Sequence, residues 1–313
     1  MLDKISGKIL NECMALKKNE SCLIVTDSRL SFIGRALYNA SLKITKKSKL
    51  ILIPIPKNHG MEPPQNIAHG MLEYDVILMP TAKSLSHTSA RKKASRRGAR
   101  IASMPGITVE MMQRALDVDF DKIKALNEKF IKKINNKNKI EITTREGTDM
   151  QFNLKSRKWI GDDGIYTKKT AFGNLPAGEV FIAPLEGKTN GTLVIDSSIS
   201  GLGKVEEKVI VQIKNGFIDK ISGGDKAIKF QKLFKNRLYK NVAELGIGTN
   251  YKAKITGNVL EDEKVYGTFH VAFGNNRHFG GKVDVPFHLD VVIKKPVIYA
   301  DDKLIIKSGQ IIE

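Results

Sequence analysis

The sequence predicts a mixed α/β plus α+β protein. An N-terminal open, mostly parallel α/β sheet domain is followed by a C-terminal, mainly antiparallel β domain with one long helix and a metal site. Apolar runs alternate with amphipathic segments through the first 136 residues, which is typical of a parallel sheet with helical crossovers. The polar stretch at 135–139 marks a linker, and short alternating runs with turn signals follow it. Histidines and carboxylates then gather in 241–299. We therefore expect domains at 1–136 and 137–313.

The N-terminal domain is expected to contain four buried parallel strands. Each is a short apolar run, such as SCLIVTD at 21–27, and strands of parallel sheets are buried on both faces. The predicted strands cover residues 21–27, 50–56, 75–81 and 99–106. The predicted helices cover residues 3–18, 29–42, 65–73, 88–97 and 107–134. Each crossover between parallel strands should be right-handed.

Polar residues after these strands are candidate binding residues, because open α/β sheets bind ligands at the carboxyl ends of their strands. They are Asp27, Ser28, Ser86, His87, Thr88 and Arg91. The chain has no glycine-rich nucleotide-binding motif. A basic cluster in the same region is interpreted as a solvated helix face, with anion recognition as the alternative. The cluster consists of Arg91, Lys92, Lys93, Arg96 and Arg97.

The C-terminal domain is expected to consist of antiparallel strands joined by tight turns. Alternating runs flank the Asn-Gly pair of Asn215 and Gly216, which is a strong hairpin signal. Residues 224–240 carry an apolar stripe at helical spacing, which predicts one helix. The other predicted elements are a hairpin over 140–154, strands at 178–184 and 191–199, and a final hairpin through 300–302.

The composition is that of an ordinary globular protein, with 41% hydrophobic and 27% charged residues. No apolar run approaches the roughly 20 residues that span a bilayer. The N-terminus lacks the order of a signal peptide. Two cysteines, Cys13 and Cys22, make no disulfide framework and indicate a reducing compartment. We therefore expect a cytoplasmic protein that does not enter a membrane.

The net charge of +19 is unevenly distributed. Residues 1–140 contain 26 Lys and Arg against 12 Asp and Glu, which gives +14, whereas 141–313 contain 26 against 21, which gives +5. Nucleic-acid binding would account for a basic half. No aromatic interleaving and no nucleic-acid-binding motif accompanies the charge, so we interpret it as solvated lysines and do not expect nucleic acid as a partner.

Five residues of the C-terminal half form a candidate metal site. Period-two alternation separates His270 from the phenylalanines of TFHVAF and places His288 and Asp290 on one strand face. Glu244 stands alone among apolar and glycine residues, and Glu179 opens a strand after a Pro-Ala-Gly turn. A buried carboxylate needs a partner. Imidazoles and carboxylates without thiolates suit Zn²⁺, Co²⁺, Mn²⁺ or Fe²⁺. The alternative is a set of core histidines and ordinary hydrogen-bonded pairs.

Four segments resemble the aminopeptidase T family, the M29 metallopeptidases, which include leucyl aminopeptidases. They are NLPAGEVFIAP, NVAELGIG, GTFHVAFGNN and FHLD. The resemblance covers most of the chain and includes an N-terminal α/β domain. It implies a homodimeric hydrolase that removes N-terminal residues from small peptides with two divalent ions. It also implies the metal ligands Glu179, Glu244, His270, His288 and Asp290, the same five residues as above.

The chain departs from this family pattern next to the site. The family's peptidases have a tyrosine seven residues after the first histidine ligand, and Arg277 stands at that position, followed by His278 in a glycine-rich loop. The segment between His270 and His288 is also short. We name Arg277 and His278 as candidate catalytic residues. In the expected mechanism, one or two metal ions activate a water, and a glutamate or His278 accepts its proton.

Two other functions use the same sequence differently. His270, His288 and Asp290 form a two-histidine, one-carboxylate set like that of non-haem Fe(II) oxygenases. A related branch, the dihydroxypyridine ring-opening dioxygenases, works in this way by resemblance, and it would take a small aromatic substrate and iron. The third alternative is a non-catalytic binding protein on the same scaffold, with the basic N-terminal half bound to an anionic partner.

Overall fold

The computed structural model describes residues 2–312 and divides into two compact units. Unit 1 contains Met1–Lys122 and Asp162–Ala177, and unit 2 contains Ile123–Gly161 and Gly178–Glu313. Each unit has its own sheet structure, and the predicted fold class is confirmed. The domain limits of 1–136 and 137–313 stay a prediction, which limited proteolysis would test. No described helix is long and apolar enough to cross a membrane.

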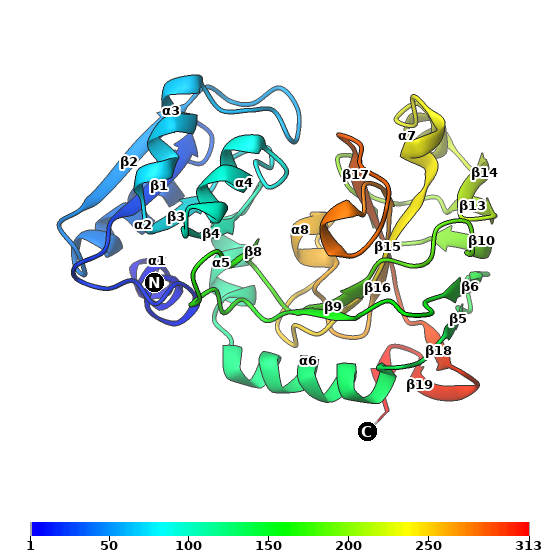
Figure 1. Cartoon of the computed structure of the whole chain (residues 1–313). Helices are drawn as coiled ribbons and strands as arrows, with labels where there is room; N and C mark the ends of the chain where they lie inside the picture. Colours follow the sequence, from blue (N-terminus) through cyan, green and yellow to red (C-terminus); the bar gives the residue numbers. More distant parts are fainter. Residues whose placement is uncertain (1, 313) are drawn as a thin grey trace. The chain divides into compact units, whose positions relative to one another are not determined.

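Unit 1 is built on a five-stranded, wholly parallel sheet in the order β2-β1-β3-β4-β8. Its strands are β1 (Cys22–Asp27), β2 (Ser48–Ile53), β3 (Val76–Met79), β4 (Arg100–Ser103) and β8 (Phe172–Asn174). The three inner strands β1, β3 and β4 are buried along their whole length, whereas the edge strand β2 leaves Leu52 51% exposed. The four predicted strands are therefore confirmed. The fifth, β8, comes from much later in the chain (Figure 1).

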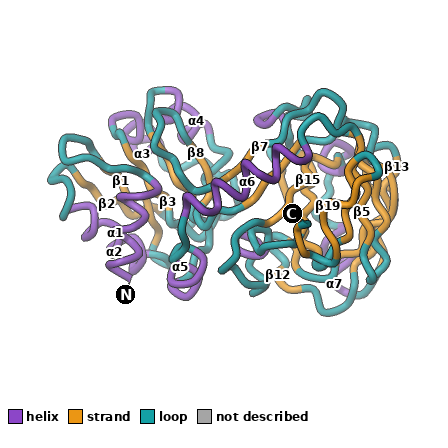
Figure 2. Tube along the Cα trace, turned by 90° about the horizontal axis from the view of Figure 1, so that it is seen from below, coloured by secondary structure: helices purple, strands orange, loops and turns teal. Residues whose placement is uncertain are grey.

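Helices cover both faces of this sheet (Figure 2). α1 contacts α2 and α5 on one face, and α3 contacts α4 on the other. The helices are α1 (Leu2–Lys8), α2 (Ser31–Leu42), α3 (Gln65–Gly70), α4 (Ser89–Arg96) and α5 (Val109–Ala115). The predicted helix over 3–18 ends early, because α1 continues only as a π-helix, η1 (Ile9–Cys13). The helix predicted over 65–73 is α3 followed by a 3₁₀ turn, η2 (Met71–Glu73).

Unit 2 contains two antiparallel sheets. One has eight strands in the order β14-β13-β10-β6-β5-β18-β19-β20, and the other has seven in the order β12-β11-β17-β16-β15-β9-β7. The eight-stranded sheet consists of β5 (Lys139–Thr143), β6 (Asp149–Asn153), β10 (Asn190–Ile195), β13 (Val209–Lys214), β14 (Phe217–Ser222), β18 (Val297–Ala300), β19 (Lys303–Lys307) and β20 (Gln310–Ile311). The seven-stranded sheet consists of β7 (Ile160–Asp162), β9 (Glu179–Ile182), β11 (Ser198–Ile199), β12 (Gly203–Lys204), β15 (Val242–Gly248), β16 (Phe269–Gly274) and β17 (His288–Ile293).

One apolar core joins the two sheets of unit 2. It contains Ile142, Phe152 and Leu193 from the eight-stranded sheet and Leu245, Phe269 and Val291 from the other. Because side chains alternate along a strand, the opposite face of β15, β16 and β17 is free to carry polar residues. All seven residues of β15 and all six of β16 are nevertheless buried. Polar groups on that face are therefore largely shielded from water.

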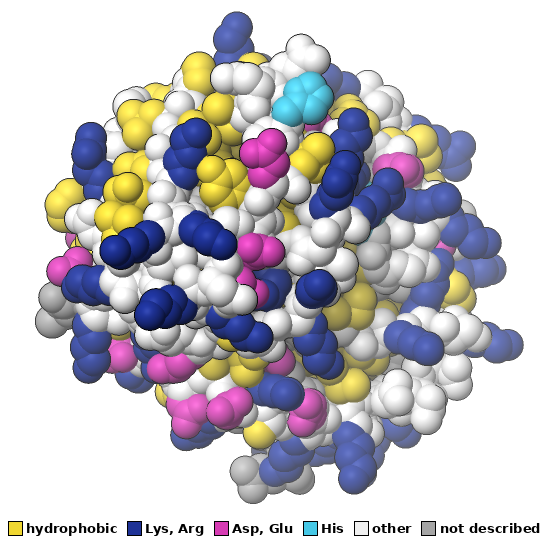
Figure 3. All heavy atoms as spheres, turned by 60° about the vertical axis from the view of Figure 1, so that its left-hand side comes forward, with side chains coloured by type: hydrophobic (Ala, Val, Ile, Leu, Met, Phe, Trp, Pro, Cys, Tyr) yellow, Lys and Arg dark blue, Asp and Glu magenta, His cyan; other side chains and the backbone are white. Residues whose placement is uncertain are grey.

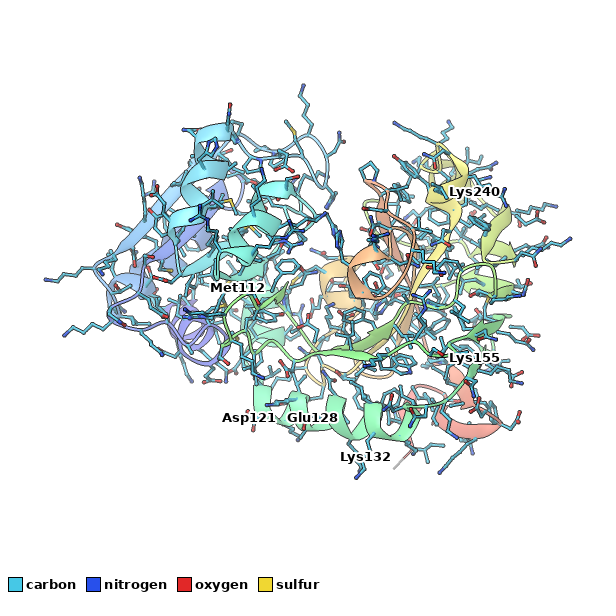
Figure 4. The ribbon with its side chains drawn as sticks, in the orientation of Figure 1. Met112, Asp121, Glu128, Lys132, Lys155 and Lys240 are labelled. Atoms are coloured by element: carbon cyan, nitrogen blue, oxygen red, sulfur yellow. The ribbon has the colours of Figure 1, made fainter. Side chains whose placement is uncertain are left out.

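The long helix of this region is α6 (Phe120–Ile134). Ile123, Asn127 and Phe130 are buried on one side of it, whereas Asp121, Glu128 and Lys132 are exposed (Figure 4). The Thr249 hydroxyl, at the end of β15, donates a 2.6 Å hydrogen bond to Oδ1 of Asn127. An apolar stripe and this buried polar contact therefore fix α6 to the strands that carry the site.

The hairpin predictions are confirmed, and one helix prediction is wrong. Asn215 and Gly216 form the β13–β14 turn with φ of 50° and 74°, the left-handed pair that a tight hairpin turn requires. Residues 224–240 do not form one helix: α7 (Asp225–Gln231) ends, and a 3₁₀ helix, η3 (Arg237–Lys240), begins after Asn236. The Asn236 side chain accepts from the Tyr239 N–H, so it caps a new helix instead of continuing the old one.

Candidate metal centre

The five predicted ligand residues lie on four neighbouring strands of the seven-stranded sheet. Glu179 begins β9, Glu244 lies in β15, His270 in β16, and His288 and Asp290 in β17. These strands pair in the order β9-β15-β16-β17 (Figure 1). The predicted alternation is confirmed: Phe269, Val271 and Phe273 of β16 enter the apolar core, and His270 points to the other face.

Small residues stand opposite each of these ligand candidates across the sheet. The pairs are Gly248–Glu179, Ala272–Glu244, Gly246–His270, Gly274–His288 and Ala272–Asp290. A Cβ at Gly246 would lie 2.0 Å from Nε2 of His270, so any larger residue there would displace the ring. The glycines and the alanine opposite the ligand candidates therefore leave room for polar side chains on this face of the seven-stranded sheet.

The five side chains form two overlapping groups that could each hold a metal ion. One group is Glu179, Glu244 and His270, and the other is Glu244, His288 and Asp290. Nε2 of His270 lies 3.3 Å from Oε2 of Glu179 and 3.4 Å from Oε1 of Glu244. Nε2 of His288 lies 3.4 Å from both Oε2 of Glu244 and Oδ1 of Asp290. Glu244 therefore stands between the two imidazoles.

The tautomer of His288 is favourable for metal binding. Its Nδ1 lies 2.9 Å from the backbone carbonyl oxygen of Asn275 and donates to it in the neutral ring. Nε2, the nitrogen that faces Glu244 and Asp290, then carries the lone pair. Hydrogen bonding of the distal nitrogen is how metal-ligating histidines are normally oriented. The backbone of the β16–β17 loop therefore aims His288 at the cluster.

A buried lysine and a further glutamate adjoin the centre, and the sequence analysis did not identify either. Lys264 is 1% exposed, and its ammonium lies 2.5 Å from Oε1 of Glu179 and 2.8 Å from Oε1 of Glu263. Glu263 and Lys264 directly follow helix α8 (Val259–Asp262). Nothing in a lysine-rich chain marks one lysine as buried. The only signal in the sequence is its place between the two segments, around Glu244 and His270, that are already assigned to the site.

The ionisable side chains in this cluster shift one another's pKa values. Burial alone would raise the pKa of Glu244, but hydrogen bonds to His270 and His288 lower it well below its usual range. Burial alone would lower the pKa of His270, yet Glu244, Glu179 and Glu263 raise it to about 9. The pKa of His288 is likewise held well above its usual value by Asp290 and Glu244. The carboxylates thus favour the protonated form of both imidazole rings, as they would favour a bound cation in the same place.

Burial raises the pKa of Glu263 to about 8, with further contributions from the charges of Asp290 and Glu179, although Lys264 opposes the shift.

The residues present fit a divalent ion of the first transition series. Within residues 2–312, Oε2 of Glu179 and Nδ1 of His270 are buried and accept or donate no hydrogen bond. A buried carboxylate oxygen that has no hydrogen-bond partner and lies beside an imidazole nitrogen can ligate a metal ion. The donors are imidazole nitrogens and carboxylate oxygens without thiolates, which suits Fe²⁺, Mn²⁺, Co²⁺ and Zn²⁺.

The two predicted catalytic residues lie in the loop between β16 and β17. Arg277 and His278 are exposed and belong to a short 3₁₀ helix, η4 (Arg277–Phe279). The third residue of that helix, Phe279, contacts the His288 ring edge-on with the ring centroids 6.0 Å apart. Phe279 also meets Phe181 of β9 edge-on at 5.6 Å. Catalytic roles for Arg277 and His278 stay predictions. The aromatic pair beside His288 is a feature that the sequence analysis missed.

The polar residues at the strand ends of unit 1 mainly support its own loops. Asp27 accepts from the backbone N–H groups of Arg29, Leu30 and Ala82. The Ser86 hydroxyl lies within hydrogen-bond distance of the Ser103 hydroxyl, at 2.9 Å, and of Oδ1 of Asn174, at 3.3 Å, and Thr88 caps α4. Arg91 donates to the Ser86 carbonyl and stacks on the Phe172 ring at 3.9 Å, so it is not a solvated residue. Ser28 is exposed.

On the face shown in Figure 3, the basic side chains do not form one continuous patch. Figure 3 shows Lys and Arg side chains interleaved with acidic and hydrophobic side chains on one face of the molecule. In α4, Lys93 and Arg96 are exposed, in agreement with a solvated helix face.

Comparison with known proteins gives consistent matches. A family model described as 2,5-dihydroxypyridine 5,6-dioxygenase matches residues 34–313. A curated relative, the 2,5-dihydroxypyridine 5,6-dioxygenase of Pseudomonas putida KT2440, is 25% identical over 243 residues, which is 73% of this chain and 69% of the relative. The solved structure of the 2,5-dihydroxypyridine dioxygenase of that strain has a TM-score of 0.84 at 20% identity and covers 99% of this chain and 96% of its own. Wild-type AmpT from Thermus thermophilus has a TM-score of 0.77 at 14% identity, over 100% and 99% of the two chains.

These matches overturn the expected activity. The prediction of an M29 aminopeptidase, a hydrolase that acts on peptides, is wrong, because the family model and the curated relative are both dioxygenases, which are oxidoreductases. The likeness to AmpT, an M29 aminopeptidase, is a likeness of fold. The motifs quoted for the resemblance are therefore carried by a scaffold that hosts more than one chemistry.

Proposed function

The chain belongs to the 2,5-dihydroxypyridine 5,6-dioxygenase family, and on this premise we propose that it is an iron-dependent dioxygenase that opens the ring of a small dihydroxylated aromatic substrate. The observation that carries the proposal is the family match over residues 34–313, together with a two-imidazole, carboxylate-rich centre on the matched strands. A small-molecule substrate suits this class of enzyme. The 2,5-dihydroxypyridine of the relatives is the first compound to test.

His270, His288 and Asp290 are the proposed iron ligands. They provide two imidazole nitrogens and one carboxylate oxygen, the set that non-haem Fe(II) oxygenases use while leaving other positions open. Glu244 lies 3.4 Å from both Nε2 atoms and adds a carboxylate oxygen that balances the charge of the ion. When bound, Fe(II) would supply the site where dioxygen and the substrate hydroxyl groups are brought together. Zn²⁺, Co²⁺ and Mn²⁺ are not proposed as the working metal.

The surroundings of His288 support an aromatic substrate. Phe181 and Phe279 form an edge-to-face pair beside the imidazole, and Phe181 lies on the same strand face as Glu179. Aromatic rings prefer offset or edge-on contact with other rings, at about 0.5–1.5 kcal/mol per pair beyond the area that they bury. We propose that this pair orients a substrate ring next to the ligand nitrogen, with Arg277 and His278 on the same loop available for its hydroxyl groups.

The test is dioxygen chemistry on the iron-loaded protein. Protein reconstituted anaerobically with Fe(II) should consume one O₂ per 2,5-dihydroxypyridine, with loss of the ring absorbance. With ¹⁸O₂, mass spectrometry should find two labelled atoms in the ring-opened product. His288→Ala and Asp290→Ala should each lower turnover at least about 100-fold, because each removes a ligand. His69→Ala, on the exposed side of α3, is the matched control.

Two results would contradict the proposal. One is folded, iron-loaded protein that takes up no oxygen with dihydroxypyridines or with catechols. The other is turnover unchanged by both ligand substitutions. The expected homodimer and cytoplasmic location stay predictions, and light scattering of the purified protein would test the first.

A further inference from the structure

Lys264 is the most unusual group near the centre. It is 1% exposed, although lysine is rarely buried without a dedicated partner. Its backbone is fixed on both sides, because its N–H donates to the Glu261 carbonyl and its own carbonyl accepts from Asn250. The ammonium reaches Glu179 at 2.5 Å and Glu263 at 2.8 Å. Lys264 and Glu179 thus form a buried ion pair in the wall of the candidate metal site.

Glu179 faces two kinds of partner at once. Its Oε1 is held by Lys264, whereas its Oε2 lies 3.3 Å from Nε2 of His270 and accepts no hydrogen bond within the described chain. Glu179 also belongs to one of the two overlapping ligand groups, whereas Asp290 belongs to the other. Two ligand groups that share one carboxylate, here Glu244, are typical of sites that bind two metal ions about 3.5–4 Å apart.

We propose that the Lys264 ammonium neutralises Glu179, the carboxylate that a second divalent ion would need as a charged ligand, and so limits this centre to one metal ion. The inference rests on the proposed function, since it requires that the centre hold a metal at all. It adds a physical reason why a protein with two possible ligand groups would bind one metal ion instead of two.

The charge of the ammonium supports this assignment. A second ion held by Glu179 and His270 would bind Oε2, the oxygen that faces the His270 ring, on a carboxylate whose Oε1 is already paired with the ammonium. Two cations on one buried carboxylate repel each other strongly where water cannot screen them. With Glu179 neutralised by Lys264, the carboxylates that remain for metal binding are Glu244 and Asp290. Their two negative charges balance one divalent ion.

The test is metal stoichiometry, measured without reference to turnover. Metal-free protein is titrated anaerobically with Co²⁺, and bound metal is determined by mass spectrometry after desalting. The wild-type protein should bind one equivalent, even in excess metal. Lys264→Met, which keeps the length of the side chain but removes its charge, should bind two. Lys303→Met, at an exposed position on β19, should stay at one.

Electron paramagnetic resonance gives a second readout. One Co²⁺ per protein gives the signal of an isolated high-spin ion, whereas two ions bridged by a carboxylate couple and weaken that signal per metal. The Lys264→Met protein at two equivalents should therefore show a smaller signal per cobalt than the wild type. Loss of turnover alone would not produce this change.

The outcomes separate the two proposals. Two equivalents in the wild type, or one in a folded Lys264→Met protein, overturn the inference and leave the proposed function standing. No binding in the wild type overturns the proposed function and this inference with it. If Lys264→Met does not fold because Glu179 and Glu263 are left unpaired, the double variant Lys264→Met/Glu263→Gln removes one of those charges and should bind two equivalents. Two equivalents in the wild-type protein overturn the inference whether or not the variants fold.

Discussion

Gly246 shows how a single residue without a side chain can define the centre. It lies directly opposite His270 in the β15–β16 register, and a Cβ there would come within 2.0 Å of Nε2 of the ring. His270 is itself 1% exposed, so its ring has little room to move away. The position of the imidazole therefore depends on the residue across the strand as much as on its own rotamer.

Gly246→Ala should reduce metal binding more than it reduces stability. The added methyl group displaces the imidazole from Glu244 and Glu179, and a misplaced ligand typically costs about 10- to 100-fold in metal affinity. Competition against a colorimetric chelator would measure this loss, and circular dichroism would show that the fold is kept. Gly7→Ala is the control, because a Cβ at Gly7 meets nothing within 4 Å and alanine favours helix α1. Unchanged metal affinity in Gly246→Ala would refute this account of the site.

Arg100 and Glu20 form a bidentate ion pair in unit 1. The guanidinium donates to both carboxylate oxygens, at 2.9 and 2.7 Å, and also to the carbonyl oxygens of Met14 and Ala15. Hydrogen bonding to Arg100 lowers the pKa of Glu20 below its usual value. This contact ties the segment after η1 to the start of β4.

The pair predicts a pH dependence of stability. Because the pKa of Glu20 is lower in the folded state, its contribution is fully present above its unfolded pKa of about 4.3 and is lost as the pH falls through the folded value. Glu20→Gln should therefore destabilise the protein at pH 7 by about 1 kcal/mol, a value reduced for solvent screening, and the difference should be smaller at pH 3. Urea unfolding at both pH values measures it. Glu12→Gln, whose carboxylate is paired with Lys8 on the surface, should show almost no difference at either pH.

Sequence patterns located the site residues on strands but could not supply their surroundings. Alternation places His270 and His288 on the polar face, and this follows from the period of a strand alone. Lys264 and Glu263 were missed because a buried ion pair depends on contacts with a strand more than eighty residues earlier. Arg91 was interpreted as solvated because stacking on Phe172 requires β8 to lie beside β4, and no local pattern in 162–177 indicates that.

At the scale of elements, helix α6 buries one apolar side and exposes the other to solvent. Phe130 is 2% exposed and belongs to the core of unit 2, whereas Lys132, two residues later, faces solvent. The same core contains the apolar faces of β16 and β17, so α6 stabilises the sheet from which the ligand residues project. The hairpins were predictable because their signals are local. The helical region predicted over 107–134 is divided into α5 and α6, and the break between α7 and η3 was not predicted either, since the apolar stripe continues across it.

Phe130→Ala should destabilise unit 2 by about 3–5 kcal/mol, through lost burial and the cavity that remains. Chemical denaturation followed by fluorescence or circular dichroism measures the change in the free energy of unfolding. Lys132→Ala is the matched control on the exposed side of the same helix, and it should change stability by less than about 0.5 kcal/mol. Equal effects of the two substitutions would show that α6 does not depend on its buried stripe.

At the scale of the whole molecule, the fold does not determine the chemistry. The same architecture matches a dioxygenase at a TM-score of 0.84 and AmpT at 0.77. Both likenesses are likenesses of fold, so they cannot by themselves separate hydrolysis from oxygen chemistry. The departures next to the site are more informative, because Arg277 replaces the tyrosine expected of a peptidase. Weighting that departure more heavily would have favoured the dioxygenase.

Metal binding should stabilise unit 2 specifically, because all five ligand candidates belong to it. Three carboxylates and two imidazoles from β9, β15, β16 and β17 are brought together only in the folded state, so an ion binds the native protein and not the unfolded chain. At a free metal concentration about 100 times Kd, this linkage contributes about 2.7 kcal/mol. Hydrogen–deuterium exchange with and without Fe(II) should show slower exchange of the β15–β17 amides in the metal-bound protein. Peptides of β1 and β3, in unit 1, serve as the internal reference. Uniform protection of both units, or none in β15–β17, would mean that the ion is not held by these strands.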